Sequence, residues 1–146
     1  MELRPMKIDD YGPVYRLWMD TPGMGLNDLD DSREGIERYL RRNPATCFTA
    51  WEGGTLLGVI LCGHDGRRGY IHHTAVRPSA RRQGVGTALV NAALDALARE
   101  GIHKAALVAF SRNAGGNAFW EKQGFTLRED LSYRNRALHE LHRIDT

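Results

Sequence analysis

The sequence predicts a mixed α/β domain built on a central sheet. Three observations predict it. Apolar residues follow a strand-like pattern in the middle of the chain, they follow a helical period near the start and again after residue 84, and Gly or Pro separates these segments. With 146 residues, 42% of them hydrophobic and 26% charged, the chain has the size and composition of a single globular domain spanning residues 1–146.

Two helices are expected after a short first strand. Asp9 or Asp10 can cap the first helix, and Asp31 with Glu34 makes a box-like start for the second. Residues 21–31 between them combine Pro, Gly and several Asp, so this segment is expected to be a mobile loop.

An antiparallel meander is predicted next. The β-rich runs 47–52 and 55–62 are joined by the glycine pair 53–54, which suits a tight hairpin because both positions can take positive φ. A third run, residues 70–76, stops before Pro78.

After residue 84 the apolar residues change from strand-like alternation to a helical period. One helical face is apolar over residues 84–100, and residues 104–110 are almost continuously apolar, as in a strand covered on both faces. A short helix over residues 113–123 precedes two final strands, around 125–127 and 131–138. Because the helix over 84–100 acts as a crossover, the strands on either side of it should be parallel, and their junction is where we expect the chemistry.

Composition excludes several classes of function. The formal net charge is only +2, from 20 Lys and Arg against 18 Asp and Glu, so no nucleic acid partner is expected. Cys47 and Cys62 lie in apolar runs without metal-ligand spacing, which indicates core residues in a reducing compartment and no metal site. The start lacks a secretory apolar stretch and no segment approaches the ~18 apolar residues of a membrane span, so a cytoplasmic protein is expected.

The hexamer Arg81-Arg82-Gln83-Gly84-Val85-Gly86 lies between a strand and a helix. Free amides and the positive end of the dipole at a helix start bind phosphate, glycine allows close approach, and the two arginines can add charge-assisted bonds. The alternative is a helix start whose glycines only permit close packing. Neither a Walker loop nor a dinucleotide fingerprint fits, because the required Lys-Ser or Lys-Thr and the third Gly are missing.

Two motifs resemble the GCN5-related N-acetyltransferase (GNAT) family. The first is its R/Q-x-x-G-x-G/A pattern, matched from Arg81 to Gly86 after the strand ending Ala75-Val76. The second is N-x-x-A-x-x-F-Y-x-x-x-G-F, which is met at Asn113, Phe119, Gly124 and Phe125, while Gly116 and Trp120 depart from it. The first 45 or so residues match only in the layout of helices.

This resemblance implies a mostly antiparallel sheet with a parallel strand pair at the cofactor site, helices on both faces, and acetyl-coenzyme A as cosubstrate. It also implies site residues. The backbone of Thr74, Ala75 and Val76 would pair with pantetheine. The amides of Arg82, Gln83, Gly84, Val85, Gly86 and Thr87 would hold the pyrophosphate, with Arg81 beside them. Asn113 would face the pantetheine arm, and Phe119 and Trp120 would lie near the thioester, although Phe119 and Trp120 also fit a purely packing role.

The usual catalytic groups of the family are absent. Tyr70 stands where the family often has a Glu base, and Trp120 stands where it has a Tyr acid. His72 shares the Tyr70 face by strand alternation and is the predicted base, since imidazole has a pKa near ~6.5. A β-bulge would promote His73 instead, and Tyr133 could supply a hydroxyl as acid. For each of these residues a packing role is the alternative.

The predicted activity is transfer of an acetyl group to a primary amine of a small or amino-acid-like acceptor. A strand amide near Thr74 would stabilise the oxyanion, by analogy with the family. Acidic residues 28–31 could attract a cationic acceptor and residues 65–68 a carboxylated one, although both are also ordinary solvated loops. The alternatives are acetylation of a protein N-terminus or lysine, and a non-catalytic acyl-coenzyme A binding module. A homodimer is compatible with the sequence.

Overall fold

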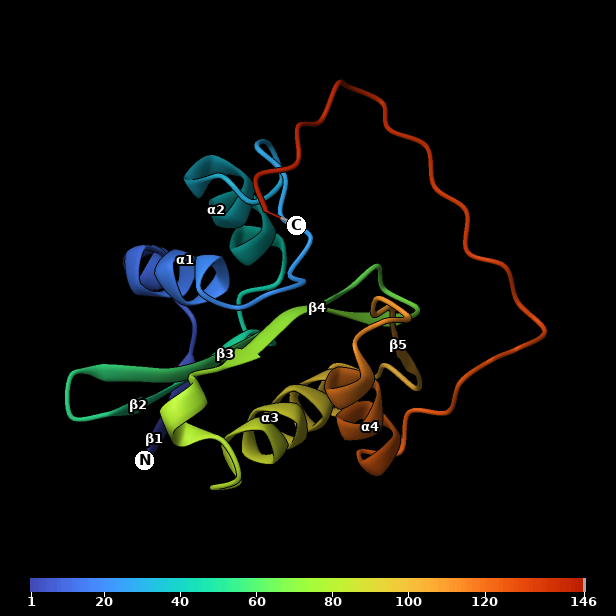
Figure 1. Cartoon of the computed structure of the whole chain (residues 1–146). Helices are drawn as coiled ribbons and strands as arrows, with labels where there is room; N and C mark the ends of the chain where they lie inside the picture. The colour runs from blue at the N-terminus through green and yellow to red at the C-terminus, as the bar shows by residue number, and fades with distance from the viewer. Residues whose placement is uncertain (146) are drawn as a thin grey trace.

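Five strands form one sheet in the computed structural model, which describes residues 1–145 (Figure 1). Their order across the sheet follows the chain: β1 (Glu2–Pro5), β2 (Phe48–Glu52), β3 (Thr55–His64), β4 (Gly69–Val76) and β5 (Ala105–Leu107). Pairing is antiparallel from β1 to β4 and parallel between β4 and β5. The predicted mixed α/β class, with one parallel pair after the meander, is therefore confirmed.

Helices cover both faces of this sheet. They are α1 (Tyr11–Met19), α2 (Arg33–Arg42), α3 (Val85–Arg99) and α4 (Ala114–Lys122), with short 3-10 turns at Ile8–Asp10 and Pro78–Ala80. Figure 1 shows α1 and α2 on one side of the sheet and α3 and α4 on the other. Two separate apolar cores result, one under each pair of helices.

The central strand β3 is the partition between the two cores. Its residues Leu56 to Gly63 are all buried, because alternate side chains point into opposite cores. Cys47 and Cys62 are buried and unbridged, as the sequence predicts, with the Cys47 thiol donating to the Cys62 carbonyl at 3.2 Å. In the described part of the chain no helix is long and apolar enough to cross a membrane.

The cap of α2 differs from the prediction. Ser32, not Asp31, is the N-cap, and its Oγ accepts a hydrogen bond from the Gly35 amide at 3.0 Å. Ser is as good a cap as Asp, so the sequence alone could not choose between neighbours. The change frees the Asp31 carboxylate, which turns inward and is buried.

The two final strands predicted around residues 125–127 and 131–138 are wrong. Residues 126–141, which we call the C-terminal arm, have no regular secondary structure and swing away from the body in a wide arc (Figure 1). The strand predicted over 104–110 is also shorter and less covered than expected: only Ala105–Leu107 pair, and Val108 is 55% exposed. Both errors have one cause, because a strand exists only where a partner accepts its hydrogen bonds, and periodicity does not supply the partner.

The chain after the arm returns to the body. Residues 142–145 dock on the loop between α1 and α2, where the His142 carbonyl accepts from the Asp28 amide at 3.0 Å. The Ile144 amide donates to the Leu26 carbonyl at 3.0 Å, and the Asp145 carboxylate accepts from the Gly25 amide at 3.1 Å. The loop expected to be mobile is therefore tied to the body by hydrogen bonds from a distant part of the chain.

Truncating Leu89 should destabilise the fold. Leu89 on α3 is fully buried, and a Cβ added at Gly58 of β3 would lie only 3.0 Å from its Cδ1, so the helix rests directly on the strand. We expect Leu89→Ala to lower the free energy of unfolding by about 2–5 kcal/mol, measured by urea titration. Leu29→Ala, at a residue 47% exposed, should change it by less than about 0.5 kcal/mol. Equal losses in both variants would contradict this packing.

Candidate active site

The parallel pairing of β4 with β5 is short. It joins Gly69 to Ala105, Tyr70 to Ala106 and Ile71 to Leu107, and then stops, although β4 continues to Val76. Within residues 1–145, the backbone of residues 72–76 therefore has no strand partner on the β5 side. Unpaired amides and carbonyls in an extended strand are ready to bind another extended chain of amides. The predicted pantetheine contacts Thr74, Ala75 and Val76 all lie in this stretch.

The start of α3 is the second feature. Gly84 is its N-cap residue and has φ of 81°, in the left-handed region that glycine adopts without strain. Among the described residues, the backbone amides of residues 82–87 have no hydrogen-bond acceptor, and a Cβ on Gly84 would meet nothing within 4 Å. The helix thus presents free donors and the positive end of a 15-residue dipole to open space.

The two arginines of the hexamer behave differently. Arg81 folds back, and its Nε donates to the Val76 carbonyl at 3.2 Å. One of the backbone groups predicted to bind pantetheine therefore already has a hydrogen-bond partner. Arg82 is exposed and has φ of 63°, unusual for a residue with a side chain. Gln83 donates to the Ser79 carbonyl at 3.3 Å. Of these three side chains, Arg82 remains free of such backbone contacts.

Gly86 is required for packing rather than for conformation. A Cβ at this position would lie 3.0 Å from the Phe119 ring, so α4 approaches α3 through this glycine. Phe119 in turn lies 5.0 Å from Trp120, and Trp120 lies 5.3 Å from Phe125, measured between ring centroids. The packing role considered for Phe119 is therefore present, and the same aromatic cluster includes Trp120.

Asn113 is the N-cap of α4. Its Oδ1 accepts from the Gly116 amide at 3.0 Å, and its side chain occupies the space that a Cβ on Gly116 would need. With Asn113 in this position, Gly116 leaves room that an Ala would not. The predicted contact of Asn113 with the pantetheine arm stays a prediction.

A β-bulge interrupts β4, as the sequence analysis allowed. Between the pairs Val59–Ala75 and Leu61–His72, β4 contains one more residue than β3, and His73 has φ of 40°. The extra residue lets neighbouring histidines point to the same face, which strand alternation would forbid. Both rings lie toward α1 and α2, His73 near Trp18 at 5.3 Å and His72 near Tyr39 at 5.9 Å.

The bulge is held by two contacts that the sequence analysis missed. The Trp18 indole Nε1 donates to the His73 carbonyl at 3.0 Å, and the His73 Nε2 lies 2.7 Å from Oδ1 of the buried Asp31. The other carboxylate oxygen of Asp31 accepts from the Asn27 amide at 2.8 Å. No local signal could have revealed a pair separated by 42 positions in the chain.

His72, the predicted base, lies in a crowded setting. Its ring is 4.6 Å from the Tyr70 ring and near those of Tyr39 and His73. Although the residue is exposed, desolvation by these neighbours lowers the pKa of His72 to about 4, with a further contribution from His73. The imidazole is therefore neutral at pH 7 and can accept a proton, but its lowered pKa makes it a weaker base than an ordinary histidine.

Tyr133, the predicted acid, belongs to the C-terminal arm and is 66% exposed. Burial raises the pKa of Tyr70, and the nearby Tyr133 raises it further. The two phenols therefore lie within electrostatic reach of each other. A role for Tyr133 as acid stays a prediction.

The acidic residues considered for a cationic acceptor all have internal partners. Asp28 accepts from the His142 amide at 2.8 Å, Asp30 accepts from the Asn27 side-chain amide at 3.0 Å, and Asp31 binds His73. In the other candidate cluster, Asp65 accepts from two amides of its own turn, which lowers its pKa. These carboxylates stabilise loops of the protein, so their role as acceptor ligands loses its main support.

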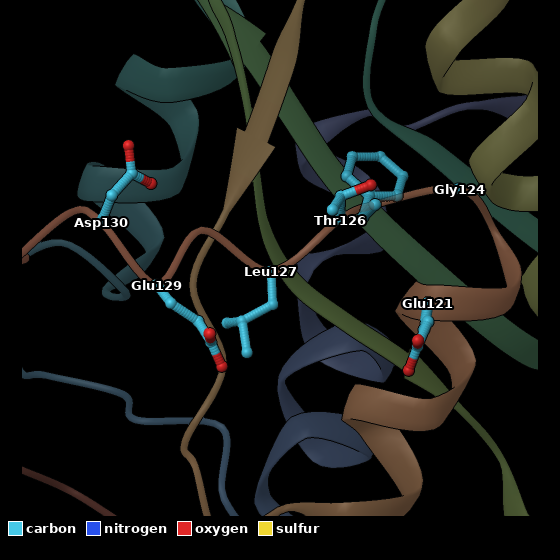
Figure 2. A pocket seen from close by; sticks show the side chains of 7 residues that line it. Glu121, Gly124, Thr126, Leu127, Glu129 and Asp130 are labelled. Carbon is cyan, nitrogen blue, oxygen red and sulfur yellow. The ribbon is translucent and has the colours of Figure 1, made fainter.

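Two hollows in the surface lie away from this site. One, of about 510 Å³, is lined by residues at the end of α4 and the root of the C-terminal arm, including Glu121, Leu127 and Glu129 (Figure 2). The other, of about 380 Å³, lies between α1, the β2–β3 hairpin and Arg77. Neither is lined by residues 72–76 or 82–87, so the candidate site, the unpaired backbone of β4 with the start of α3, coincides with neither hollow.

Comparison with known proteins agrees with this geometry. The profile of the acetyltransferase (GNAT) family matches residues 12–125, most of the chain. The chain therefore belongs to the GNAT family, as the motifs indicate, and it is an N-acetyltransferase. Acetyltransferase SG1711 of Sodalis glossinidius is 28% identical over 140 residues, covering 96% of this chain and 97% of that protein. Acetyltransferase YPTB2753 of Yersinia pseudotuberculosis is 27% identical over 138 residues, covering 94% and 96%.

Solved structures share the fold. Ard1 from Thermoplasma volcanium superposes with a TM-score of 0.77 at 23% identity, over 87% of this chain and 83% of that one. The PaiA N-acetyltransferase of Thermoplasma acidophilum, in complex with coenzyme A, has a TM-score of 0.72 at 18% identity, over 87% and 90%. Rv2747 from Mycobacterium tuberculosis, in complex with CoA and NLQ, has a TM-score of 0.71 at 19% identity, over 88% and 74%.

The low pKa of His72 predicts a pH-dependent stability. Unfolding restores the ordinary value of about 6.5, so between pH 6.5 and pH 4 the unfolded chain binds a proton that the folded chain does not. Stability should therefore fall as the pH falls through this window. In urea titrations at several pH values, His72→Gln should show a shallower decline than the wild type.

Above about pH 7.5 the imidazole is neutral in both states, so the difference in stability between wild type and His72→Gln should there be independent of pH. That range is the control. Parallel stability curves for the two proteins across the whole range from pH 8 to pH 4 would rule out the shift.

Proposed function

We propose that the chain transfers an acetyl group from acetyl-coenzyme A to the primary amine of a small or amino-acid-like acceptor. One observation carries the proposal: free amides at the start of α3 lie beside a stretch of β4 that lost its partner strand. A molecule that joins a diphosphate to a chain of amides fits both surfaces: the diphosphate at the start of α3 and the amides along β4. Coenzyme A has both parts.

The pyrophosphate would bind at residues 82–87. The donors there are backbone amides and a helix dipole, which bind an anion without a large net charge, in agreement with a formal charge of only +2. The left-handed Gly84 removes the side chain that would block the approach, and the exposed Arg82 guanidinium can add a charge-assisted bond. The coenzyme A complexes of PaiA and Rv2747, which share this fold, support the assignment.

The pantetheine arm would lie along Thr74 and Ala75, whose backbone faces the open side of β4. Phe119 lies against Gly86 and would contact the pantetheine arm there, with Trp120 next to it. The Val76 carbonyl is already bound by Arg81, so we assign it no pantetheine contact unless Arg81 moves.

When bound, the cosubstrate supplies an acyl thioester. The protein's residues would accept and donate protons around it and stabilise the charge that develops. As the acceptor nitrogen bonds to the carbonyl carbon and the carbon–sulfur bond breaks, the nitrogen loses a proton to the imidazole of His72. The amide of Thr74 would donate to the developing oxyanion. The thiol has an ordinary pKa near ~8.5, so it leaves readily, and the hydroxyl of Tyr133 is the candidate donor to its sulfur.

The α1–α2 loop favours a small acceptor. Gly23 and Gly25 of this loop lie against the Phe110 ring, which follows β5, with Cβ positions 3.8 and 3.6 Å from the ring. Residues 142–145 hold the loop in this place by hydrogen bonds. A loop fixed against Phe110 cannot easily move aside for a polypeptide, so the protein-acetylation alternative has less support.

Gly84→Asp should weaken coenzyme A binding. The substitution places a negative charge in the open space where the diphosphate would lie. Gly84→Asn is the matched control, because asparagine has the same shape, no charge, and tolerates the left-handed region. By isothermal calorimetry we expect Gly84→Asp to bind coenzyme A about tenfold or more weakly than Gly84→Asn, the effect of one charge near a phosphate. Equal affinity in the two variants, both folded by circular dichroism, would sink the assignment.

His72→Gln should slow acetyl transfer. If His72 accepts the proton of the amine, its loss should lower kcat about 100-fold or more while coenzyme A affinity stays unchanged. Thiol release from acetyl-coenzyme A with a panel of small amines measures the rate. His103→Gln, at an exposed site just before β5 and outside residues 72–76 and 82–87, serves as the control. Full activity in His72→Gln would remove this residue as the base without affecting the binding proposal.

A further inference from the structure

The hollow beside α1 has no part in the proposed acetyl transfer. Its volume is about 380 Å³, which is in the range of small-molecule sites. Three parts of the chain that are distant in sequence form it: α1, the β2–β3 hairpin and the residues that follow β4. We call it the α1 hollow. It is lined by charged groups of both signs together with apolar side chains.

Arg77 is held in a fixed position at this hollow. Its backbone amide donates to the Leu57 carbonyl at 2.7 Å, and its side-chain Nε donates to the Leu56 carbonyl at 2.9 Å. Within residues 1–145 the two terminal nitrogens of this guanidinium have no hydrogen-bond acceptor. Because the side chain is already oriented, it would lose little freedom on binding a carboxylate with these nitrogens.

Two opposite charges of α1 line the same hollow. Asp20 is the C-cap residue of α1 and follows Arg16 by one helical turn. Side chains at this spacing can pair, but in the described part of the chain no ion pair joins them or links either one to another group. With Arg77, the hollow therefore holds two positive charges and one negative charge that the protein itself does not pair.

Trp51 and Leu17 give the hollow an apolar wall. Leu17 is buried, and Trp51 is half-buried. The indole is fixed from two directions, because its Nε1 donates to the Thr49 hydroxyl at 2.8 Å and the Arg4 guanidinium lies 4.5 Å from the ring centroid. Since its N–H is already bonded, the ring contributes apolar surface, on which an aliphatic or aromatic group can pack.

These groups together select the chemistry of a ligand. A carboxylate would bind the guanidiniums of Arg77 and Arg16, and an ammonium group would bind the carboxylate of Asp20. A simple anion would face Asp20 without a compensating positive charge, and a simple amine would face two guanidiniums. A zwitterion with an apolar side chain satisfies all three charges and the apolar wall.

We propose that the α1 hollow binds a free α-amino acid with an apolar side chain. Its carboxylate would lie at Arg77 and Arg16, its ammonium group at Asp20 and its side chain on Trp51. The site is separate from the candidate active site, because none of residues 72–76 or 82–87 lines it and α1 and α3 lie on opposite faces of the sheet (Figure 1). The proposal does not depend on the acetyl-transfer activity.

Three probes test the need for both charges. L-Phenylalanine carries both, 3-phenylpropionate lacks the ammonium group, and phenethylamine lacks the carboxylate. By isothermal calorimetry, without acetyl-coenzyme A, we expect L-phenylalanine to bind about tenfold more tightly than either of the others, because each loses one charge-assisted contact. Equal affinities for the three probes, or no binding of L-phenylalanine up to its solubility limit, would overturn the proposal.

A charge-neutral double variant locates the binding. Arg16→Gln/Asp20→Asn changes two exposed residues and leaves the net charge of the protein unchanged, so folding should be unaffected. It should bind L-phenylalanine about tenfold or more weakly than the wild type. Glu34→Gln/Arg38→Gln is the matched control, since it removes the same two charges, also four positions apart and exposed, from α2. An equal loss in both double variants would contradict a site at the α1 hollow.

The single variant Asp20→Asn tests the assigned ammonium contact. Without the carboxylate, the protein should no longer distinguish L-phenylalanine from 3-phenylpropionate, because only the ammonium group separates these probes. An undiminished preference for L-phenylalanine in this variant would show that Asp20 does not bind the ammonium group, and the proposed recognition would be wrong.

His72→Gln separates this site from the acceptor site, where an amino acid is also a candidate ligand. Binding of L-phenylalanine at the α1 hollow should be unchanged in this variant. If His72→Gln weakened binding and Arg16→Gln/Asp20→Asn did not, the amino acid would occupy the acceptor site. That result would overturn the present proposal and would support the proposed function.

Discussion

The parallel pairing of β4 with β5 stops after Ile71 and Leu107, and the site depends on that end point. Up to there the two strands are bonded, and beyond it β4 continues alone while the chain after β5 turns toward α4. The free side of β4 leads directly to the free amides at the start of α3. A single interruption in the sheet thus leaves an unpaired strand edge next to a helix start with free amides, the two surfaces proposed to bind coenzyme A.

The bulge at His73 determines which side chains of β4 face α1 and α2. One extra residue in β4 brings two successive histidines onto one face, and a residue with φ of 40° needs support from its surroundings. Trp18 from α1 and Asp31 from the α1–α2 loop provide it, through the carbonyl and the ring of His73. Helix α1 and the α1–α2 loop therefore hold β4 in its irregular form.

The C-terminal end of the chain has two different roles. Residues 142–145 stabilise the α1–α2 loop, whereas the arm before them leaves exposed apolar surface and unpaired backbone. A domain rarely leaves a strand-like segment and a strand edge both open, because each is a site for association. Tyr133 lies on this arm, so the geometry of the arm also decides whether its hydroxyl can reach the groove.

The sequence by itself determined much of the local structure, including the helix start that is proposed to bind the diphosphate. Alternation and helical periodicity located β2, β3, β4, α1 and α3 to within a few residues, and Gly84 marked a helix start whose amides are free, because these properties depend on neighbours in the chain. Prediction from the sequence failed where the local structure depends on a partner that is distant in the chain. Asp31 looked like a helix cap and instead binds His73, and the segment 131–138 has the pattern of a strand but no strand beside it. Tertiary structure settled these points because hydrogen bonds between distant residues depend on how elements pack, which periodicity does not encode.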